Sequence, residues 1–413
     1  MKTIIINIGD ELLIGQVTNF NASWMAEQLN KNGIEVIRIN VISDTEIEIM
    51  NALKDAEKNA DLIILTGGLG PTNDDITKET LCKYFNTHLI FDEDAFKNIE
   101  SLFKNRGFAM TELNHKQAEV PANCKVISNS EGTAPGLWLE KNNKVFIATP
   151  GVPFEMKTMM SNFIIPMINE RIGDDIIVHK TILTQGLGES FLAEKIAAWE
   201  NQLPKNIRLA YLPSPGMVKL RLTVRGKERS KLNILIKDEI IKLKEIISEN
   251  IFGYDDESLE QIIGRLLIEK GKTMVTAESC TGGFIAHTIT KVHGSSRYFK
   301  GSVIAYSNEV KENILGVKNQ TLIKFGAVSE ETVKEMAKNV CKKLNADFSV
   351  AVSGIAGPDG GTDEKPVGLV WIAVASSKIC KAQKFQFGNN RLVNIERATV
   401  TALNMLRKMI LED

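Results

Sequence analysis

The feature that most constrains the fold is a regular alternation of short apolar runs with amphipathic stretches across the first 170 residues. The runs Ile4–Ile6 and Leu62–Leu65 contain no alternating polar residue, which is typical of strands buried on both faces of a parallel sheet. This pattern predicts an α/β fold with a doubly wound parallel sheet. The predicted elements are strands at 3–8, 35–42, 61–66, 136–140 and 145–149, helices at 19–32 and 46–59, and further helices from about residues 76 and 150.

Two polar, glycine-containing stretches divide the chain into three predicted domains. They are Gly173-Asp-Asp and Phe252-Gly-Tyr-Asp-Asp-Glu. The segment between them predicts a small α+β unit, with strands at 176–184, 207–211 and 218–225 and helices at 189–200 and 227–250. A chain of 413 residues suits two to three domains of ordinary size. We therefore expect a doubly wound domain at 1–172, a middle domain at 173–253 and a C-terminal α/β domain at 254–413.

Composition excludes several classes of protein. The 50 Lys and Arg residues balance 51 Asp and Glu residues, which argues against a general binder of nucleic acid or of anionic membranes. The five cysteines are scattered, and their spacing suits neither zinc nor a disulfide framework. The apolar run at the start is too short for a signal peptide, and no run approaches transmembrane length. We expect a reduced, cytoplasmic protein that does not enter a membrane.

Residues 276–283, Thr-Ala-Glu-Ser-Cys-Thr-Gly-Gly, carry the first candidate for catalysis. A short apolar strand precedes them and an amphipathic helix follows, so Ser279 is predicted on a strand-to-helix turn. The N–H groups that begin a helix are available to bind an oxyanion while a serine attacks a carbonyl. The alternative is that Ser279 only caps the helix.

A serine nucleophile needs a base, and the best candidate is a lysine. The segment 301–311 predicts a strand ending near Tyr306 and a helix that carries Lys311. A lysine serves as base when burial lowers its pKa, whereas His287 and His293 are more simply surface or core residues. Residues 351–362 then enter a glycine-rich loop, which either lets the backbone approach a phosphate or forms a flexible hairpin loop.

These three segments together resemble the C-terminal domain of CinA proteins, over residues 255–413. The matching motifs are Thr-Ala-Glu-Ser-Cys-Thr-Gly-Gly, Tyr-Ser-Asn-x-x-Lys and Ser-Gly-Ile-Ala-Gly-Pro-x-Gly-Gly-Thr-x-x-Lys-Pro-Val-Gly. The resemblance implies a nicotinamide mononucleotide deamidase that needs no cofactor, with Ser279 as nucleophile and Tyr306 and Lys311 as its activating partners. Cys280 is a rival nucleophile, but it points about 100° away from Ser279 if the helix has begun. The residues expected to bind substrate are Thr281, Gly282, Gly283, Ser353, Gly354, Gly357, Gly360, Gly361 and Thr362.

The first domain carries a second set of polar loops after its buried strands. One is Gly9-Asp-Glu-Leu-Leu-Ile-Gly-Gln and the other is Thr66-Gly-Gly-Leu-Gly-Pro-Thr-Asn-Asp-Asp. Ligands of open α/β sheets bind beyond the carboxyl ends of the strands, glycines allow a phosphate to approach, and carboxylates hold a cation such as Mg²⁺. Each aspartate alone is also explained as a helix cap. The expected phosphate-binding residues are Gly67, Gly68 and Gly70, and the expected metal ligands are Asp10, Asp44, Asp74 and Asp75.

This half resembles the molybdopterin-binding, MogA-like fold in its CinA version, over residues 1–170. The motifs Gly-Asp-Glu-Leu-Leu-x-Gly, Thr-Gly-Gly-Leu-Gly-Pro-Thr-x-Asp-Asp and Gly-Thr-Ala-Pro-Gly (132–136) are present. The resemblance implies a metal-dependent ADP-ribose pyrophosphatase that yields AMP and ribose 5-phosphate, and Asp44 and Asp75 match acidic positions of the fold. Asn19 departs from the pattern, because Asp is common there and its charge is lost.

Three functions therefore remain open at this point. The leading one is a bifunctional hydrolase of pyridine-nucleotide salvage, whose substrates are nicotinamide mononucleotide and ADP-ribose. The second is a molybdopterin-handling enzyme, and the third is a competence or DNA-damage accessory protein that acts by protein contact. The middle domain resembles the KH-like domain of CinA proteins, but it lacks the interleaved aromatic and basic residues of RNA binders. We expect it to be a spacer or a dimer element, and the protein to be a homodimer.

Overall fold

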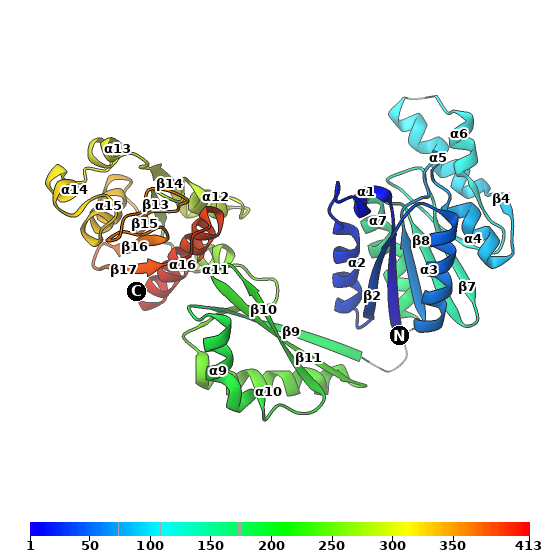
Figure 1. The fold of residues 1–413 in the computed structure, drawn as a ribbon, viewed down its shortest axis with the longest axis horizontal. Coiled ribbons are helices and arrows are strands. Elements are labelled where there is room, and N and C mark those ends of the chain that lie inside the picture. Colours follow the sequence, from blue (N-terminus) through cyan, green and yellow to red (C-terminus); the bar gives the residue numbers. More distant parts are fainter. Residues whose placement is uncertain (73, 108, 172–175) are drawn as a thin grey trace. The chain divides into compact units, whose positions relative to one another are not determined.

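The computed structural model describes residues 1–72, 74–107, 109–171 and 176–413, which form two compact units (Figure 1). Unit 1 comprises Met1–His179 and Val224–Asn233, and unit 2 comprises Lys180–Thr223 and Ile234–Asp413. The predicted linker at residues 173–175 lies outside the described residues. Within the described residues, no helix combines the length and the apolar character needed to cross a membrane.

Unit 1 is built on a six-stranded sheet. In spatial order the strands are β2 (Glu35–Ile42), β1 (Lys2–Ile8), β3 (Leu62–Thr66), β8 (Lys144–Thr149), β7 (Gly136–Lys141) and β6 (Lys125–Ile127). The strands from β2 to β8 run parallel, whereas β7 and β6 are antiparallel to their neighbours. The prediction of a doubly wound α/β domain is confirmed, but the sheet is mixed rather than wholly parallel.

Helices cover both faces of this sheet (Figure 1). Ile4 and Ile6 pack against α3 in one apolar cluster, and Ile5 packs with α2 and the helices after β8 in another. All three isoleucines are fully buried, and each such burial stabilises the fold by roughly 1.5–3 kcal/mol. The uninterrupted Ile run is therefore explained by burial on both faces. The helices are α1 (Asp10–Leu13), α2 (Phe20–Lys31), α3 (Glu46–Asn59), α4 (Thr77–Phe85), α7 (Pro153–Met159), a π-helical turn (Met160–Ile164) and α8 (Ile165–Asn169).

A tight hairpin causes the change of strand direction. Asn142 and Asn143, between β7 and β8, have φ angles of 52° and 62°. Two consecutive residues with positive φ form the turn that matches the twist of a two-stranded hairpin, and asparagine tolerates that conformation best after glycine. A helical excursion interrupts the sheet order earlier in the chain. It consists of β4 (Leu89–Phe91), α5 (Glu93–Arg106), α6 (Glu112–Gln117) and β5 (Glu119–Pro121).

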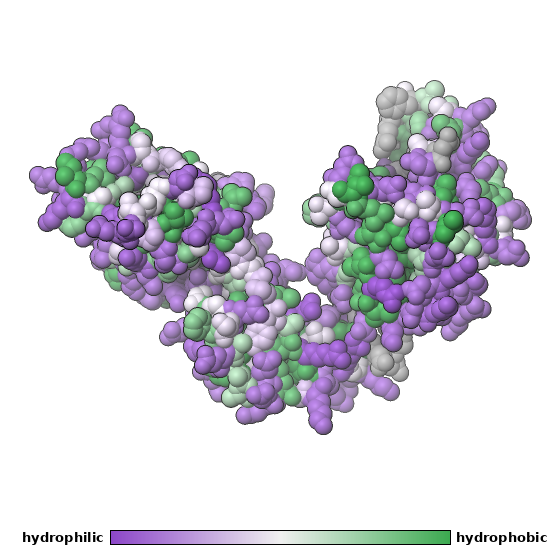
Figure 2. Space-filling view, viewed as in Figure 1, coloured by the Kyte–Doolittle hydropathy of each residue, from purple (hydrophilic) through white to green (hydrophobic). Residues whose placement is uncertain are grey.

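Hydrophobic residues gather on one exposed part of unit 1. Figure 2 shows them in green over α1, α2 and α7. Leu13, Ile14, Phe20 and Phe154, which belong to these helices and their flanking loops, are each more than half exposed. Leu13 and Ile14 belong to the segment Gly9–Gln16, which the sequence predicts to be part of the N-terminal site. Apolar surface therefore adjoins the polar edge of the sheet.

Two further sheets lie mainly in unit 2. The smaller has the order β10 (Ile207–Ser214), β11 (Met217–Gly226), β9 (Ile176–Gln185) and β12 (Ile251–Tyr254), and it is accompanied by α9 (Glu189–Glu200) and α10 (Arg229–Ile247). The larger has the order β14 (Phe299–Ile304), β13 (Met274–Glu278), β15 (Phe348–Gly354), β16 (Leu369–Ser376) and β17 (Cys380–Gln386). The strands β14, β13 and β15 are parallel, and the last two are antiparallel.

Helices cover both faces of the larger sheet as well. One face of β15 packs against α11 and α16, and the other packs against α15. The helices of this region are α11 (Leu259–Glu269), α12 (Phe284–Thr290), a 3-10 turn (Ser295–Arg297), α13 (Asn308–Asn313), α14 (Asn319–Phe325), α15 (Glu330–Lys343) and α16 (Arg391–Glu412). The predicted α/β character of residues 254–413 is thereby confirmed.

The two parts of unit 2 share apolar core. Leu183 of β9 and Phe252 of β12 are at most 8% exposed, and they belong to the same buried cluster as Leu259 of α11 and Leu403 of α16. The predicted boundary near residue 253 therefore separates residues that pack together. The domain boundary at this position remains a prediction, and the structure shows that apolar side chains pack across it.

A truncation experiment measures the contact. A fragment of residues 255–413 lacks Leu183 and Phe252, and loss of a buried Phe side chain alone costs about 3–5 kcal/mol. Each kcal/mol shifts the melting temperature of a domain of this size by about 2–4 °C. We expect the fragment to melt at least about 6 °C below a fragment of residues 176–413 in matched thermal scans. Equal melting temperatures would show that the shared cluster contributes no stability.

Candidate active sites

The first candidate site lies at the carboxyl ends of the parallel strands of unit 2. Ser279 directly follows β13, and its backbone N–H donates to the carbonyl of Val352 in β15 over 2.9 Å. On the other side, the N–H of Ala305 donates to the carbonyl of Glu278 over 2.7 Å. The strand ends are thus held in register, so the segments that follow them meet at one edge of the sheet.

Lys311 reaches this edge from α13. It is 1% exposed, and its Nζ donates to Ser279 Oγ over 3.0 Å, to the Ala305 carbonyl over 2.8 Å and to the Tyr306 carbonyl over 3.3 Å. All three partners are uncharged oxygens. Burial lowers the pKa of Lys311 below its usual value. The structure therefore brings together the predicted nucleophile and the predicted base.

Tyr306 lies differently from Lys311. Its side chain is 60% exposed, and its hydroxyl accepts a hydrogen bond from Arg391 Nη2 over 2.9 Å. Its contact with Lys311 is made by the backbone carbonyl. Arg391, the first residue of α16, also donates from Nη1 to the carbonyl of Gly357 over 2.8 Å. The arginine was not predicted from the sequence, because it follows the last glycine-rich motif by more than twenty residues and belongs to no motif of its own.

These residues line a cavity of about 290 Å³. Of the predicted substrate-binding residues, Ser353, Gly354, Gly357 and Gly360 belong to the lining. Ser353 is buried and donates to the carbonyl of Ala327 over 2.7 Å. The other five are not among the lining residues; they are Thr281, Gly282, Gly283, Gly361 and Thr362.

The turn after Ser279 corrects one expectation. Helix α12 begins at Phe284, and its N-terminal donors do not face the cavity as free groups. The N–H groups of Gly283, Ile285 and Ala286 donate to the buried carboxylate of Glu278 over 2.8–3.1 Å. An oxyanion therefore cannot use these three donors. Thr281, which was predicted to bind substrate, instead stabilises the turn, because its hydroxyl donates to Glu278 over 2.8 Å.

The rival nucleophile is poorly suited to the reaction. Cys280 is buried, and burial raises the pKa of its thiol to about 12. A thiol acts as a nucleophile through its thiolate, which such a pKa suppresses at neutral pH. Ser279 is therefore the better candidate of the two.

The second candidate site lies at the carboxyl ends of β1 and β3 in unit 1. Gly67 has a φ of 110°, and a Cβ at this position would come within 2.2 Å of the Ile8 carbonyl oxygen. Gly67 is therefore required by the close approach of two backbones. Farther along the loop, Asp75 accepts from the backbone N–H of Thr72 over 3.0 Å and also from its hydroxyl.

Several carboxylates lie near Asp44, which follows β2, but they do not meet at one point. Burial raises the pKa of Asp44, and the negative charges of Asp10, Glu11 and Asp74 raise it further against the opposing effect of a backbone hydrogen bond at Asp10. Asp44 Oδ1 is buried and has no hydrogen-bond partner. Within the described ranges, no three His, Cys, Asp or Glu side chains are grouped closely enough to hold a metal ion. The negative charge at this edge of the sheet suits a cation, whose remaining ligands would be water or substrate phosphate.

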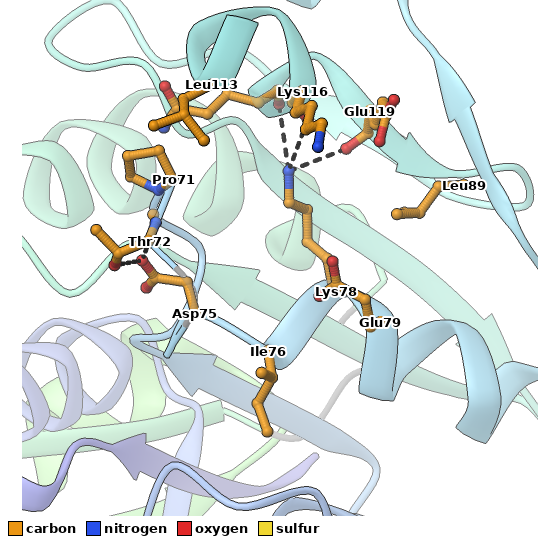
Figure 3. Close-up of a pocket in the computed structure, with 12 residues that line it drawn as sticks. Pro71, Thr72, Asp75, Ile76, Lys78, Glu79, Leu89, Leu113, Lys116 and Glu119 are labelled. Carbon is orange, nitrogen blue, oxygen red and sulfur yellow. Dashed lines mark hydrogen bonds between the residues drawn. The ribbon is translucent and has the colours of Figure 1, made fainter.

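A cavity of about 240 Å³ adjoins this loop, and Gly70 and Asp75 line it (Figure 3). The other predicted residues of this half are not in its lining; they are Gly67, Gly68, Asp10, Asp44 and Asp74. Figure 3 shows Lys78 reaching from α4 toward the end of α6. Lys78 is 6% exposed, and its Nζ donates to the carbonyls of Lys116, Gln117 and Glu119 over 3.1–3.4 Å. Lys78 was not predicted from the sequence, because it lies after the motif that ends at Asp75.

Asn19 has a local structural role. It is the N-cap of α2, and its side-chain oxygen accepts from the N–H of Ala22 over 3.1 Å. Asparagine and aspartate cap helices about equally well, so the departure from the family pattern preserves the cap.

Comparison with known proteins assigns each region to a family. Residues 4–170 match the model described as "Probable molybdopterin binding domain", residues 179–253 match "Damage-inducible protein CinA KH domain", and residues 256–410 match "CinA C-terminal domain". These matches agree with the three resemblances found in the sequence.

Full-length relatives extend the comparison. A CinA-like protein of Cytophaga hutchinsonii is 47% identical over 408 residues, which cover 99% of this chain and 98% of the relative. A CinA-like protein of Flavobacterium psychrophilum is 48% identical over 418 residues, covering 100% and 99%. The crystal structure of the competence/damage inducible protein CihA from Agrobacterium tumefaciens covers 37% of this chain and 96% of its own, at 38% identity and a TM-score of 0.35. From the full-length matches, the chain belongs to the CinA family.

Proposed function

We propose that the C-terminal domain is a serine amidase that converts nicotinamide mononucleotide to nicotinate mononucleotide and ammonia. The observation that carries this proposal is the set of partners around Lys311. Two of them are carbonyls, which only accept hydrogen bonds, and the third is the Ser279 hydroxyl, which can also donate. A neutral amine satisfies all three, because its two N–H groups bond the carbonyls and its lone pair faces the serine.

The reaction then proceeds in two stages. Lys311 takes the proton of Ser279 as Oγ bonds to the carboxamide carbon, and the resulting ammonium returns a proton to the amide nitrogen as the C–N bond breaks and ammonia leaves. A water molecule next gives a proton to Lys311 while its oxygen attacks the acyl-serine ester. Nicotinate mononucleotide is released, and the proton returns to Ser279.

The rest of the cavity fits the phosphorylated riboside. Arg391 brings a positive charge to the lining, and arginine binds phosphate through paired N–H groups. The glycines beside it allow the backbone to approach the ligand. In this arrangement Tyr306 orients Arg391 through its hydroxyl, 2.9 Å away, and contributes to Lys311 only through its backbone. Tyr306 therefore acts in substrate binding more than in proton transfer.

For the N-terminal domain we propose hydrolysis of ADP-ribose to AMP and ribose 5-phosphate. The support is the concentration of negative charge at Asp44, Asp10 and Asp74 beside a glycine loop. Mg²⁺ typically takes only one or two protein carboxylates and completes its shell with water and substrate phosphates, so separated carboxylates suit it. When bound, the cation would neutralise the diphosphate. Asp44 would hold it, with Asp10 and Asp74 as the neighbouring negative charges.

The nucleophile is tested by Ser279→Ala. We expect ammonia release from nicotinamide mononucleotide to fall by about 10⁴-fold or more, the scale seen when a serine nucleophile is removed. Hydrolysis of ADP-ribose by the same preparation is the internal control and should be unchanged. Normal ammonia release by the variant would contradict the serine mechanism.

The base is tested by the pH dependence of kcat/KM and by Lys311→Met. A neutral amine is the active form, so kcat/KM should rise with pH until it passes the lowered pKa of Lys311 and then level off. Lys311→Met should lower kcat by about 100-fold or more and remove this rise. An effect on KM alone would assign Lys311 to phosphate binding.

Burial of Lys311 also has a consequence for stability. The unfolded chain holds the Lys311 proton more tightly than the folded chain, so the free energy of unfolding should increase with pH between the lowered pKa and about 10.5. This contribution should be absent from Lys311→Met. Urea unfolding at several pH values compares the two proteins, and identical pH slopes would contradict a depressed pKa.

The metal requirement is tested with EDTA. We expect EDTA to abolish ADP-ribose hydrolysis and added Mg²⁺ to restore it, while ammonia release in the same sample continues. Binding of molybdopterin, with no turnover of ADP-ribose at any metal concentration, would favour the pterin-handling alternative. Metal-independent cleavage of ADP-ribose would refute the role given to the carboxylates.

A further inference from the structure

The proposed amidase contains a second buried charged residue that its chemistry does not use. Glu278, the last residue of β13 and the neighbour of Ser279, is fully buried. Its Oε2 accepts from the N–H groups of Gly283 and Ile285 and from the hydroxyl of Thr281. Its Oε1 accepts from the N–H of Ala286. On the sheet side it accepts from the hydroxyl pair of Thr276 and Ser302, which bond each other over 2.7 Å and so have one proton left for Oε1.

We propose that Glu278 is a positioning residue, which fixes the turn that presents Ser279 to Lys311. The proposal rests on the amidase function given above. One carboxylate joins the end of β13 to the first turn of α12 through three backbone N–H groups, so the five residues between them close into a single loop. Ser279 is the first residue of that loop. Its hydroxyl lies 3.0 Å from Lys311 Nζ only while the loop keeps this conformation.

Glu278 also decides which backbone donors remain for the reaction. Within residues 279–286, all of which the structure describes, the N–H groups of Cys280 and Thr281 alone have no hydrogen-bond acceptor. Cys280 lines the cavity beside Ser279. Because the carboxylate binds the later donors, the N–H groups of Cys280 and Thr281 are the ones that remain in this turn to stabilise a developing oxyanion. Displacement of the turn would move the nucleophile and these donors together.

The substitution Glu278→Gln tests the proposal at nearly constant volume. A carboxamide has one accepting oxygen and one donating NH₂ group. In either orientation, the NH₂ group meets a backbone N–H: that of Ala286 on one side, or those of Gly283 and Ile285 on the other. The turn must shift to relieve this opposition, and a misplacement of about 1 Å lowers rates by roughly 100-fold.

Asp347→Asn is the matched control. Asp347 precedes β15, at the opposite end of the same parallel strands, and it accepts from the N–H and the hydroxyl of Thr273 over 2.8 Å each. Both variants replace an anchoring carboxylate by an amide, and both should lower the melting temperature. Only Glu278→Gln should lower kcat for nicotinamide mononucleotide, by about 10- to 100-fold, with KM within two-fold of the wild-type value.

Each outcome decides the proposal. Wild-type kcat in a folded Glu278→Gln protein overturns it, and a change confined to KM overturns it by assigning Glu278 to substrate binding. Equal losses of kcat in both variants reduce the effect to general stability and also overturn it. Absence of ammonia release by the wild-type protein would instead refute the amidase function, so the two failures are distinguishable.

A milder variant keeps the test available if Glu278→Gln does not fold. Thr276→Val removes one hydroxyl of this pair, which lies 3.2 Å from Oε1 and 2.7 Å from Ser302 Oγ, and it introduces no opposing donor. We expect kcat to fall at least about three-fold at unchanged KM. Wild-type kcat in that variant would overturn the proposal.

Discussion

The parallel register of β13 between β14 and β15 is the constraint on which the C-terminal site depends. Glu278 is aligned with Ile304 on one side and with Val352 on the other, so β13 and β14 end at the same level and β15 continues only to Gly354. Segments that are separated by tens of residues in the sequence therefore begin side by side: the turn at Ser279, the turn at Tyr306 and the loop that follows Gly354. A shift of register in either strand would separate Ser279 from Lys311, because Lys311 is anchored to the carbonyl of Ala305 directly after β14.

This constraint explains why much of the site could be predicted from the sequence. Residues at the carboxyl ends of adjacent parallel strands lie close together because of the topology. Apolar runs followed by polar motifs therefore predict that Ser279 and Lys311 are near each other. Arg391 could not be found in this way. It enters the cavity from the first turn of the last helix, and its position depends on how α16 packs across the sheet rather than on a strand end.

Neither the role of Glu278 nor the Asn142–Asn143 turn was predicted from the sequence, and the reasons differ. A glutamate in a buried strand contradicts the apolar pattern, and a buried polar residue is the informative exception in any core. Its partners, however, are backbone groups, which the sequence does not reveal. The asparagine pair, in contrast, is a local sequence signal for a hairpin. Because this signal was not used, the sheet of unit 1 was predicted to be parallel, whereas β7 and β8 are antiparallel.

Lys78 and Lys311 are both buried, and they show that the hydrogen-bond partners of an amine determine its chemical role. Burial lowers the pKa of both Lys78 and Lys311. The three partners of Lys78 are carbonyls, and only an ammonium has a proton for each of them. Loss of its proton would leave a buried carbonyl without a donor, which opposes the effect of burial, so Lys78 is suited to supply a fixed positive charge beside the cavity. Lys311 has two carbonyl partners, and its third partner is the Ser279 hydroxyl. Because a hydroxyl can donate, a neutral Lys311 can direct its lone pair to Ser279 for proton transfer. Burial lowers the pKa of both lysines, so the difference in their chemical roles follows from one hydrogen-bond partner.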